Sequence, residues 1–408
     1  MLQQQQFDKA LVTFNKLINL QPSNAEAYYN RGIVHASMGN MALAIADYSK
    51  TIELLPKKTE AYVNRGSAYS GLKQYKQALD DYNKAIELNP KIAEVYNNRG
   101  YLYRLQNKPD EAMKDFDKAI VLNPKYSKAY INKALANSES GKHKEAVEIL
   151  STLIGLNPNF APAYFNRALE YTQLGDKRNA LNDYDKGLSL EPGDVPALYS
   201  RAHIRSESGD NLGAIKDGTA LLKLDPNNAK VFYLRADAQY NLKHYKEAVD
   251  DYTHAVESKP EYWEAFIHRG NAFDMMGKYE DALKDYYKAT ELHPEAVESY
   301  EQRAVARLAK NDVTGALSDL SKAMKIAPKD IKIIEKRAIL WAAVKDYKTA
   351  AEDYSKILEI DAANIPALNS RGDLYVKLNN KEQACLDYRK AEALGSGAAM
   401  SKRIFNCK

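Results

Sequence analysis

Cysteine is nearly absent from this chain, which has only Cys385 and Cys407 among 408 residues. Two cysteines are too few for a disulfide framework of the kind that holds small secreted domains together. Long apolar runs are missing as well, since none approaches the roughly 18 residues that a membrane-spanning helix needs. The first residues, Met-Leu-Gln-Gln-Gln-Gln, have neither the basic start nor the apolar core of a secretory signal. We therefore expect a cytoplasmic protein with no membrane insertion, or a periplasmic one if a signal peptide has been removed.

No charge of one sign is in excess. The chain has 58 Lys and Arg against 54 Asp and Glu, which gives a net charge of +4. A protein that binds nucleic acid needs a strongly basic surface. The composition therefore gives no support for nucleic acid as a partner.

Catalytic and metal-binding motifs are also lacking. The sequence has no Gly-rich phosphate loop, no His-Glu-x-x-His, no Cys-x-x-Cys and no Gly-x-Ser-x-Gly. The seven histidines never stand four residues apart on one expected helix, and His268 has no neighbouring acid or thiol in the sequence. We interpret each histidine as a packing or surface residue, and we expect no cofactor, no bound metal and no enzymatic activity.

A repeat of 34 residues dominates what the sequence does contain. Asn-Arg-Gly recurs at that step, beginning at Asn30, Asn64 and Asn98, and the same step continues to Ala398 without insertion or deletion. A unit this short cannot bury its own apolar face, so copies must stack into an extended array. The eleven units begin at Ala25, Thr59, Ala93, Ser127, Ala161, Val195, Ala229, Trp263, Val297, Ile331 and Ile365.

Each unit predicts two helices joined by a short turn. Counting places from the first residue of a unit, place 8 is Gly or Ala and place 20 is Ala in all eleven, as a close helix crossing requires. Place 15 is Gly, Asn or Lys, and Gly and Asn tolerate the left-handed conformation that ends a helix. Place 32 is Pro in nine units and stops the second helix. Apolar residues at helical spacing give each helix one buried stripe.

These features resemble the tetratricopeptide repeat (TPR) family. Its pattern has a bulky residue at place 4, Gly or Ala at 8, an aromatic at 11, Ala at 20, an aromatic at 24, Ala at 27 and Pro at 32. The second unit shows all of it with Tyr62, Gly66, Tyr69, Ala78, Tyr82, Ala85 and Pro90. The resemblance covers Ala25 to Ala398. It implies an all-α fold, a right-handed superhelix (α-solenoid) of antiparallel helix pairs, with the first helix of each pair, helix A, lining a concave groove.

Three segments follow from this division. Residues 1–24 are expected to form a half-repeat, helix B without helix A, as a cap or at the edge of a longer chain. Residues 25–398 are expected to hold the eleven units. Residues 399–408 are expected to form a short capping helix whose Ile404 and Phe405 cover the last pair.

Charged residues recur with the same period. Place 7 is Arg and place 23 is Asp in the same ten units, and the remaining unit has Lys133 and Ile149 instead. Because both residues change together, we predict an Arg–Asp pair between the two helices of one repeat. Such a pair would be bidentate and partly desolvated, and we interpret the row as architecture rather than as a ligand track.

Place 6 is the strongest candidate for ligand contact. It holds Asn in the first five units, and the resemblance places it in the groove, where a similar row of Asn in O-GlcNAc transferase grips the backbone of an extended peptide. An amide offers a donor and an acceptor together and so matches a peptide unit. Asn at this place is, however, common in the family with or without a ligand. The candidate peptide-binding residues at places 5 and 6 are Asn30, Asn64, Asn98, Asn132, Asn166, Tyr29, Asn97, Phe165, Tyr199 and Tyr233.

We therefore expect a scaffold or adaptor that binds extended polypeptide in the concave groove. One alternative is a structural array that docks folded partners or itself through its convex face and ends, and another is the substrate-recruiting arm of a larger enzyme. The ending from Ala384 resembles stand-alone bacterial TPR proteins, which weakens the last alternative. A carboxylate clamp of the co-chaperone type is not expected, because place 5 never holds Lys and place 6 never holds Arg.

Overall fold

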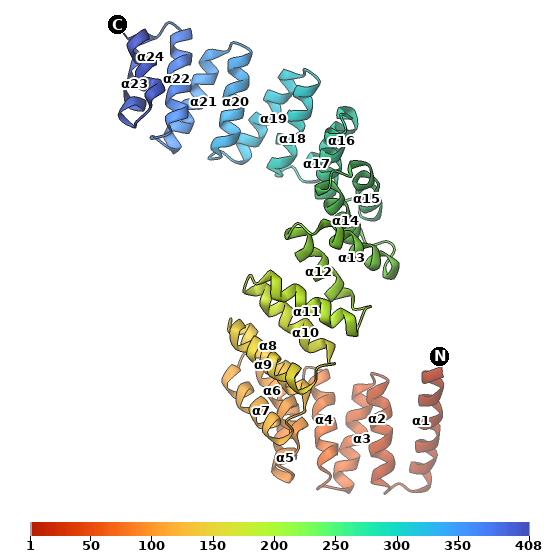
Figure 1. The fold of residues 1–408 in the computed structure, drawn as a ribbon. Helices are drawn as coiled ribbons and strands as arrows, with labels where there is room; N and C mark the ends of the chain where they lie inside the picture. Colours follow the sequence, from red (N-terminus) through yellow and green to blue (C-terminus); the bar gives the residue numbers. More distant parts are fainter. Residues whose placement is uncertain (1, 408) are drawn as a thin grey trace. The chain divides into compact units, whose positions relative to one another are not determined.

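The computed structural model describes residues 2–407, which form only helices and connecting turns (Figure 1). The helices are α1 (Leu2–Leu20), α2 (Ala25–Ser37), α3 (Met41–Leu54), α4 (Thr59–Gly71), α5 (Tyr75–Leu88), α6 (Ala93–Leu105), α7 (Pro109–Leu122), α8 (Ser127–Glu139), α9 (His143–Leu156), α10 (Ala161–Gln173), α11 (Lys177–Leu190), α12 (Val195–Glu207), α13 (Asn211–Leu224), α14 (Ala229–Asn241), α15 (Tyr245–Ser258), α16 (Trp263–Met275), α17 (Tyr279–Leu292), α18 (Val297–Ala309), α19 (Val313–Ile326), α20 (Ile331–Ala343), α21 (Tyr347–Ile360), α22 (Ile365–Lys377), α23 (Lys381–Ala393) and α24 (Gly397–Asn406).

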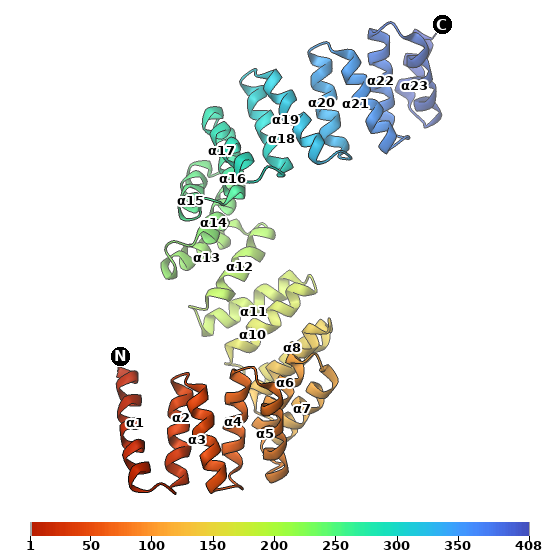
Figure 2. The same ribbon diagram turned by 180° about the vertical axis from the view of Figure 1, so that it is seen from behind.

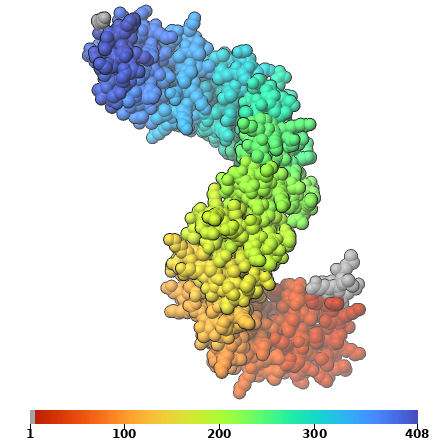
Figure 3. Space-filling view, viewed as in Figure 1, coloured from red at the N-terminus to blue at the C-terminus, as the bar shows by residue number. Residues whose placement is uncertain are grey.

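The helices confirm the expected all-α fold of paired helices. Every even-numbered helix from α2 to α22 begins at the first place of a repeat and is a helix A, and the odd-numbered helix after it is the corresponding helix B. Residues 1–197 and 198–408 form two compact units. Within each unit, consecutive helices pack against one another, as α2 does against α3 and α14 against α15, and the same antiparallel pairs are seen from behind (Figure 2). In the space-filling view, neighbouring repeats of a unit form a continuous packed layer (Figure 3).

Within each unit, helices A also approach one another. Helix α4 touches α2 and α6, and α16 touches α14 and α18, whereas no two helices B have contacts of comparable extent among the described residues. Neighbouring helices A are therefore closer together than neighbouring helices B. The helix A face is the inner face of each unit.

The turn at place 15 has a left-handed backbone in all eleven repeats. Gly141 has φ 73°, but Lys73 has φ 59° and Asn107 has φ 57°, so residues with side chains adopt the same conformation. This conformation ends helix A and lets the chain reverse after one or two residues. The turn predicted from Gly and Asn at this place is confirmed.

Small residues let the two helices of a repeat pack closely. The Ala at place 20 is fully buried in every repeat. At place 8 of the second repeat, a Cβ on Gly66 would lie 2.7 Å from the ring of Tyr82 and 3.3 Å from the carbonyl oxygen of Ala78. The aromatic ring at place 24 thus occupies the volume that glycine leaves free, and the small residues serve the close crossing that the sequence predicts.

All ten predicted Arg–Asp pairs form within single repeats. The Nε and Nη2 atoms of each Arg donate to the two carboxylate oxygens of its Asp over 2.6–3.0 Å. In most repeats, Nη1 donates to a hydroxyl or amide oxygen at place 25 of the preceding repeat, as Arg65 does to Ser49 over 3.0 Å. One guanidinium thus joins two helices of its own repeat to the helix before them.

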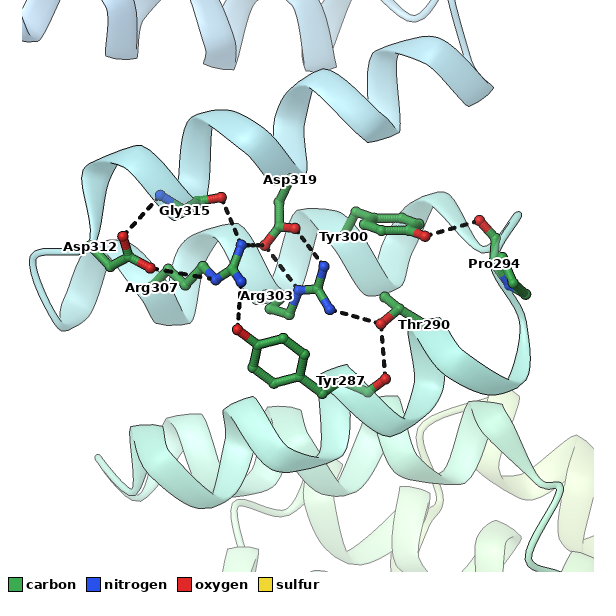
Figure 4. Close-up of polar contacts among 9 residues, drawn as sticks. All are labelled: Tyr287, Thr290, Pro294, Tyr300, Arg303, Arg307, Asp312, Gly315 and Asp319. Carbon is green, nitrogen blue, oxygen red and sulfur yellow. Dashed lines mark hydrogen bonds and ion pairs between the residues drawn. The ribbon is translucent and has the colours of Figure 1, made fainter.

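The ninth repeat shows this arrangement with an added cation (Figure 4). Arg303 donates to Asp319 and, at 2.8 Å, to Thr290 of the preceding repeat. Arg307 replaces the usual aromatic at place 11 and adds a 2.7 Å bond to Asp319. In the fourth repeat, where the pair is absent, Lys133 instead binds Asp117 of the preceding repeat at 2.7 Å. Where both the Arg and the Asp are missing, the Lys at place 7 therefore pairs with the preceding repeat instead of its own.

The two ends of the chain differ from their expected roles in one respect. Helix α1 packs against α2, as a helix B would. Helix α24 contacts α22 and α23 and buries Ala399, but Ile404 is 51% exposed and Phe405 84% exposed, so the prediction that these two residues cover the last pair is wrong. At about 100° per residue, Ile404 and Phe405 lie roughly 140° and 240° around the helix from Ala399. Cys407 packs on the core instead and forms a disulfide with Cys385 of α23.

Candidate functional site

Four of the five asparagines at place 6 donate their amide to a group of this chain. Asn30 and Asn166 donate to carbonyl oxygens of their own helices, Glu26 at 2.9 Å and Pro162 at 2.7 Å. Asn98 accepts instead, from the amide of Asn97. All five side chains are partly exposed on helices A.

Side chains at place 5 bond to side chains at place 6 of the following repeat. The amide of Asn64 donates to the Tyr29 hydroxyl at 3.0 Å, and the amide of Asn132 donates to Asn97 Oδ1 at 2.9 Å. Each of these amides keeps a second N–H, and neither carbonyl oxygen has a partner among residues 2–407. The bonds therefore fix the direction of the amides and leave a donor and an acceptor for a ligand.

Two of the residues expected to line the groove serve mainly as support. Asn97 is buried, and its amide group is used by Asn98 and Asn132. Phe165 lies over Gly187, where a Cβ would come within 2.2 Å of the ring. Neither residue offers a free polar group at the surface. Both hold the helix A face in place.

Within residues 198–408, one hollow lies on a helix A face. It has a volume of about 260 Å³ and is lined by Tyr199, Tyr233 and Tyr262, with Asp237, Ser206 and Glu207 among the other lining groups. The rings of Tyr233 and Tyr262 lie 5.0 Å apart, centroid to centroid. The structure therefore brings the two predicted tyrosines, Tyr199 and Tyr233, to one site. A second hollow of about 310 Å³ adjoins it and shares Ser206 and Asp237.

A hydrogen-bonded network connects the two hollows. Asp237 Oδ1 accepts from the Tyr252 hydroxyl and lies 2.8 Å from His268 Nδ1, and the Tyr233 hydroxyl lies 3.2 Å from the same imidazole. No acid is adjacent to His268 in the sequence, but the structure brings Asp237 to it. The acid comes from place 9 of the preceding repeat, on α14, while His268 lies on α16.

This site is electronegative. Burial raises the pKa of Tyr262, and Glu264, Tyr199 and Asp237 add to that effect. Burial also opposes the charged form of His268, but the hydrogen bond that His268 donates to Asp237 and the nearby carboxylates outweigh it and raise the pKa of His268. A cation in this place is stabilised by the same carboxylates. The site is therefore suited to positively charged groups.

Sequence reasoning missed three members of this site, namely Asp237, Tyr262 and His268. Asp237 stands at place 9, which was expected to face the groove, and it follows Tyr233 by one helical turn. The one signal that could have found it is rarity, because place 9 is Asp in only two of the eleven repeats, at Asp237 and Asp373.

The described residues contain no group of three or more His, Cys, Asp or Glu placed to hold a metal ion. Among the described helices, none combines the length and the apolar character needed to cross a membrane. The polar groups of the helix A faces offer hydrogen bonds, aromatic surface and negative charge. These groups can contact a ligand.

Sequence comparison identifies repeats over most of the chain. The family described as tetratricopeptide repeat matches residues 25–58, 59–92, 93–126, 127–160, 161–194, 229–262, 263–296 and 365–394, and a TPR repeat is matched at residues 2–39. The matched boundaries coincide with the units that begin at Ala25, Thr59 and Ala93. No curated protein matches the chain.

Solved structures of repeat proteins are similar in fold. The C-terminal part of a TPR repeat-containing protein from Cytophaga hutchinsonii aligns with a TM-score of 0.51 at 21% identity, covering 59% of this chain and 98% of that one. Yeast Tom70 aligns with a TM-score of 0.42 at 18% identity and covers 94% of both chains. YrrB, described as a TPR protein with an unusual peptide-binding site, aligns with a TM-score of 0.37 at 24% identity, covering 46% of this chain and 97% of that one.

Proposed function

This chain belongs to the tetratricopeptide repeat family, and from that premise we propose that it is a scaffold that binds an extended polypeptide along the helix A faces of its repeats. The family and the fold support a protein-interaction scaffold in general. The observation that carries the more specific proposal is the set of oriented amides at place 6. They recur once per repeat in the first five repeats and keep hydrogen-bonding capacity.

The spacing of these amides supports an extended ligand. Asn64 and Asn132 are each held by a place 5 residue of the preceding repeat, so their carbonyl oxygens are fixed before a ligand arrives. Fixed groups bind with a smaller loss of conformational entropy than mobile ones. An amide that recurs at each of the first five repeats can bond to backbone groups of a ligand and is insensitive to the side chains between them. The expected ligand is therefore polypeptide with modest sequence selectivity.

The test uses peptides selected from a displayed library of random 12-residue sequences. Their affinity is measured for the full chain and for a triple variant in which Asn64, Asn98 and Asn132 become Ala. The matched control replaces Gln77, Glu111 and Glu145 by Ala, since these exposed residues lie on helices B of the same three repeats.

We expect the groove variant to lose at least tenfold in affinity, about 1.4 kcal/mol, while the control variant binds as the parent does. Circular dichroism on both variants checks that the helices persist. Equal affinities for parent and groove variant, or a loss confined to the control, would show that the peptide binds elsewhere.

The alternative, docking through the ends, has its own support. On α24, Met400, Ile404 and Phe405 are all exposed apolar side chains on the last helix. An exposed apolar surface of this kind often marks an interaction site. Sedimentation of the parent and of a Phe405→Ser variant tests it, because a self-associating parent should become monomeric in the variant. Identical sedimentation of the two would argue against this alternative.

We expect no catalytic activity. The cellular compartment of the protein is a separate proposal, which rests on its disulfide. Cys385 and Cys407 are paired in the structure, with 5.8 Å between their Cα atoms. Disulfides persist mainly in oxidising compartments. We therefore favour the alternative of an oxidising location, such as a bacterial periplasm, over the cytoplasmic one. Mass spectrometry after alkylation without reductant, on protein from its native cells, decides between them, because free thiols would be alkylated only in a reducing location.

A further inference from the structure

We propose that the hollow formed by Tyr199, Tyr233, Tyr262 and Asp237 binds the cationic side chain, Arg or Lys, of a partner polypeptide. This inference rests on the proposed function and adds the chemical class of residue that one site selects. It is carried by a comparison between repeats. Elsewhere in the chain, the same places already hold a cation that the chain itself supplies.

The first internal example is Tyr29, which stands at place 5 as Tyr233 does. Lys58 Nζ lies 4.5 Å from the centre of the Tyr29 ring and 2.5 Å from Glu26 Oε1. Lys58 stands at place 34 of its repeat, where repeat seven has Tyr262. At Tyr233 the chain thus supplies a second ring in place of the cation. The aromatic surface for a cation is enlarged, and no Lys or Arg of the described residues lies over the Tyr233 ring as Lys58 does over Tyr29.

The second internal example is Asp373, which stands at place 9 as Asp237 does. Its Oδ1 accepts from the Tyr388 hydroxyl at 2.7 Å, and its Oδ2 binds Lys402 Nζ at 2.5 Å. Asp237 repeats the first half of this arrangement, since its Oδ1 accepts from the hydroxyl of Tyr252. Both tyrosines stand at place 24.

At Asp237 no Lys takes the place of Lys402, and the only cationic partner among the described residues is His268, which lies at Oδ1. Lys402 follows Asp373 by 29 positions, and the residue at that distance from Asp237 is Phe266. Asp237 Oδ2 has no partner among residues 2–407, and the side chain is 30% exposed where it lines both hollows. A carboxylate oxygen oriented by two bonds to Oδ1 is therefore available to a ligand.

The size and charge of the hollow agree with a side chain as ligand. Its volume of about 260 Å³ is below the roughly 300 Å³ at which sites for whole small molecules begin. Glu207 lines it, Glu298 lines the adjoining hollow, and Glu264 acts electrostatically on Tyr233 and Tyr262. Lys259 Nζ lies 5.0 Å from the centre of the Tyr262 ring. Lys259 shows that a ring of this site attracts an ammonium group.

The experiment measures the affinity of the full chain for fluorescein-labelled 12-residue peptides by fluorescence anisotropy. One peptide alternates Ser with Arg, a second alternates Ser with Lys, and a third alternates Ser with citrulline, which has the shape of Arg without its charge. A fourth, with Glu in place of Arg, reports on charge of the opposite sign. All are measured at one salt concentration, because screening changes every charged interaction.

Two variants localise the effect. Asp237→Asn removes the charge of the site, and Tyr233→Leu removes one ring. Asp373→Asn is the matched control, because it removes the same charge at the same place where Lys402 already fills the site. We expect Asp237→Asn and Tyr233→Leu each to weaken the Arg peptide roughly tenfold, and Asp373→Asn to leave it within twofold. Circular dichroism and thermal unfolding of each variant check that it folds.

Two outcomes overturn the proposal. One is a citrulline peptide that binds as tightly as the Arg peptide, and the other is a loss in Asp373→Asn as large as that in Asp237→Asn. In either case, the triple variant at Asn64, Asn98 and Asn132 separates the two ideas. If that variant still weakens binding, the polypeptide groove stands and only the cation site falls. If it does not, both fall together.

Discussion

Replacing Asp353 by Asn is expected to destabilise repeat ten far more than the loss of a surface ion pair would. Asp353 accepts from Arg337 Nε at 2.8 Å and from Nη2 at 2.6 Å. The substitution keeps the shape of the side chain and removes its charge. The guanidinium of Arg337 then stays between α20 and α21 and faces a neutral amide in place of a carboxylate.

The magnitude follows from burial. The side chain of Arg337 is 10% exposed and that of Asp353 is 1% exposed. Removing one partner of a buried pair costs about 3–5 kcal/mol, whereas exposed pairs contribute about 0–1 kcal/mol. Lys356 lies 3.3 Å from Asp353 and loses a partner as well. We therefore expect a loss of about 3 kcal/mol in the free energy of local unfolding.

Repeat four provides the matched control within the same chain. Its Lys133 binds Asp117, whose side chain is 56% exposed. Replacing Lys133 by Met should cost less than about 1 kcal/mol. A further variant, with Arg337→Met and Asp353→Leu together, should recover at least half of the loss, because two apolar groups leave no buried charge.

The assay is amide hydrogen exchange of α20 and α21, because repeat arrays open locally and a single unfolding transition does not report on one repeat. Exchange from these helices should accelerate by about two orders of magnitude in Asp353→Asn, while α4 and α5 keep their protection. An acceleration in Asp353→Asn no greater than that of α8 and α9 in Lys133→Met would refute the view that these pairs hold the repeats together.

Three other predictions follow from particular residues. The pKa of His268 is raised in the folded state, so its stabilising effect is full below the unfolded pKa of about 6.5 and is lost as pH rises through the folded pKa. The stability advantage of the parent over His268→Gln should therefore fall as pH rises above about 6.5, and an advantage that grows with pH would contradict this. Reduction of the Cys385–Cys407 bond, which spans 22 residues, should lower the free energy of unfolding of the last repeat by about 3 kcal/mol, seen as faster exchange of α24 amides, and unchanged exchange would count against it. Lys73→Gly should stabilise the second repeat by about 1 kcal/mol because Lys73 has φ 59°, whereas Gly141→Ala, at φ 73°, should destabilise the fourth repeat. Chemical denaturation of both variants measures the two changes in the free energy of unfolding, and changes of the same sign would be inconsistent with strain at place 15.

The fold was largely predictable because the repeats follow one another without a gap. Every helix A begins where the sequence places the start of a unit, as at Ala25 and Ile365. The Arg–Asp pairing was predictable because Lys133 and Ile149 depart together in one repeat. Repetition thus supplies, within one chain, the comparison that identifies which residues depend on one another.

The candidate site was less predictable, because it depends on how successive helices are rotated. Tyr199 and Tyr233 were expected on the helix A face, and they meet at one hollow. The contact of His268 with Asp237 joins residues that differ in place and in repeat, so no period reveals it. The rotation of α24 about its own axis was equally hard to predict. The turn before it, with Gly395 at φ 95°, is not one of the eleven turns at place 15 and so has no counterpart in the other repeats. This rotation determines which side of α24 faces the core, with Ala399 buried and Phe405 exposed.

Site-specific photo-crosslinking tests the central claim most directly. A benzophenone side chain is placed at Asn98, on helix A of the third repeat, or at Glu111, on helix B of the same repeat, and each full-length protein is irradiated with a library-selected peptide. Because the helix A face is proposed to hold the polypeptide, the peptide should be attached from position 98 and not from position 111. Attachment from position 111 alone would contradict the account.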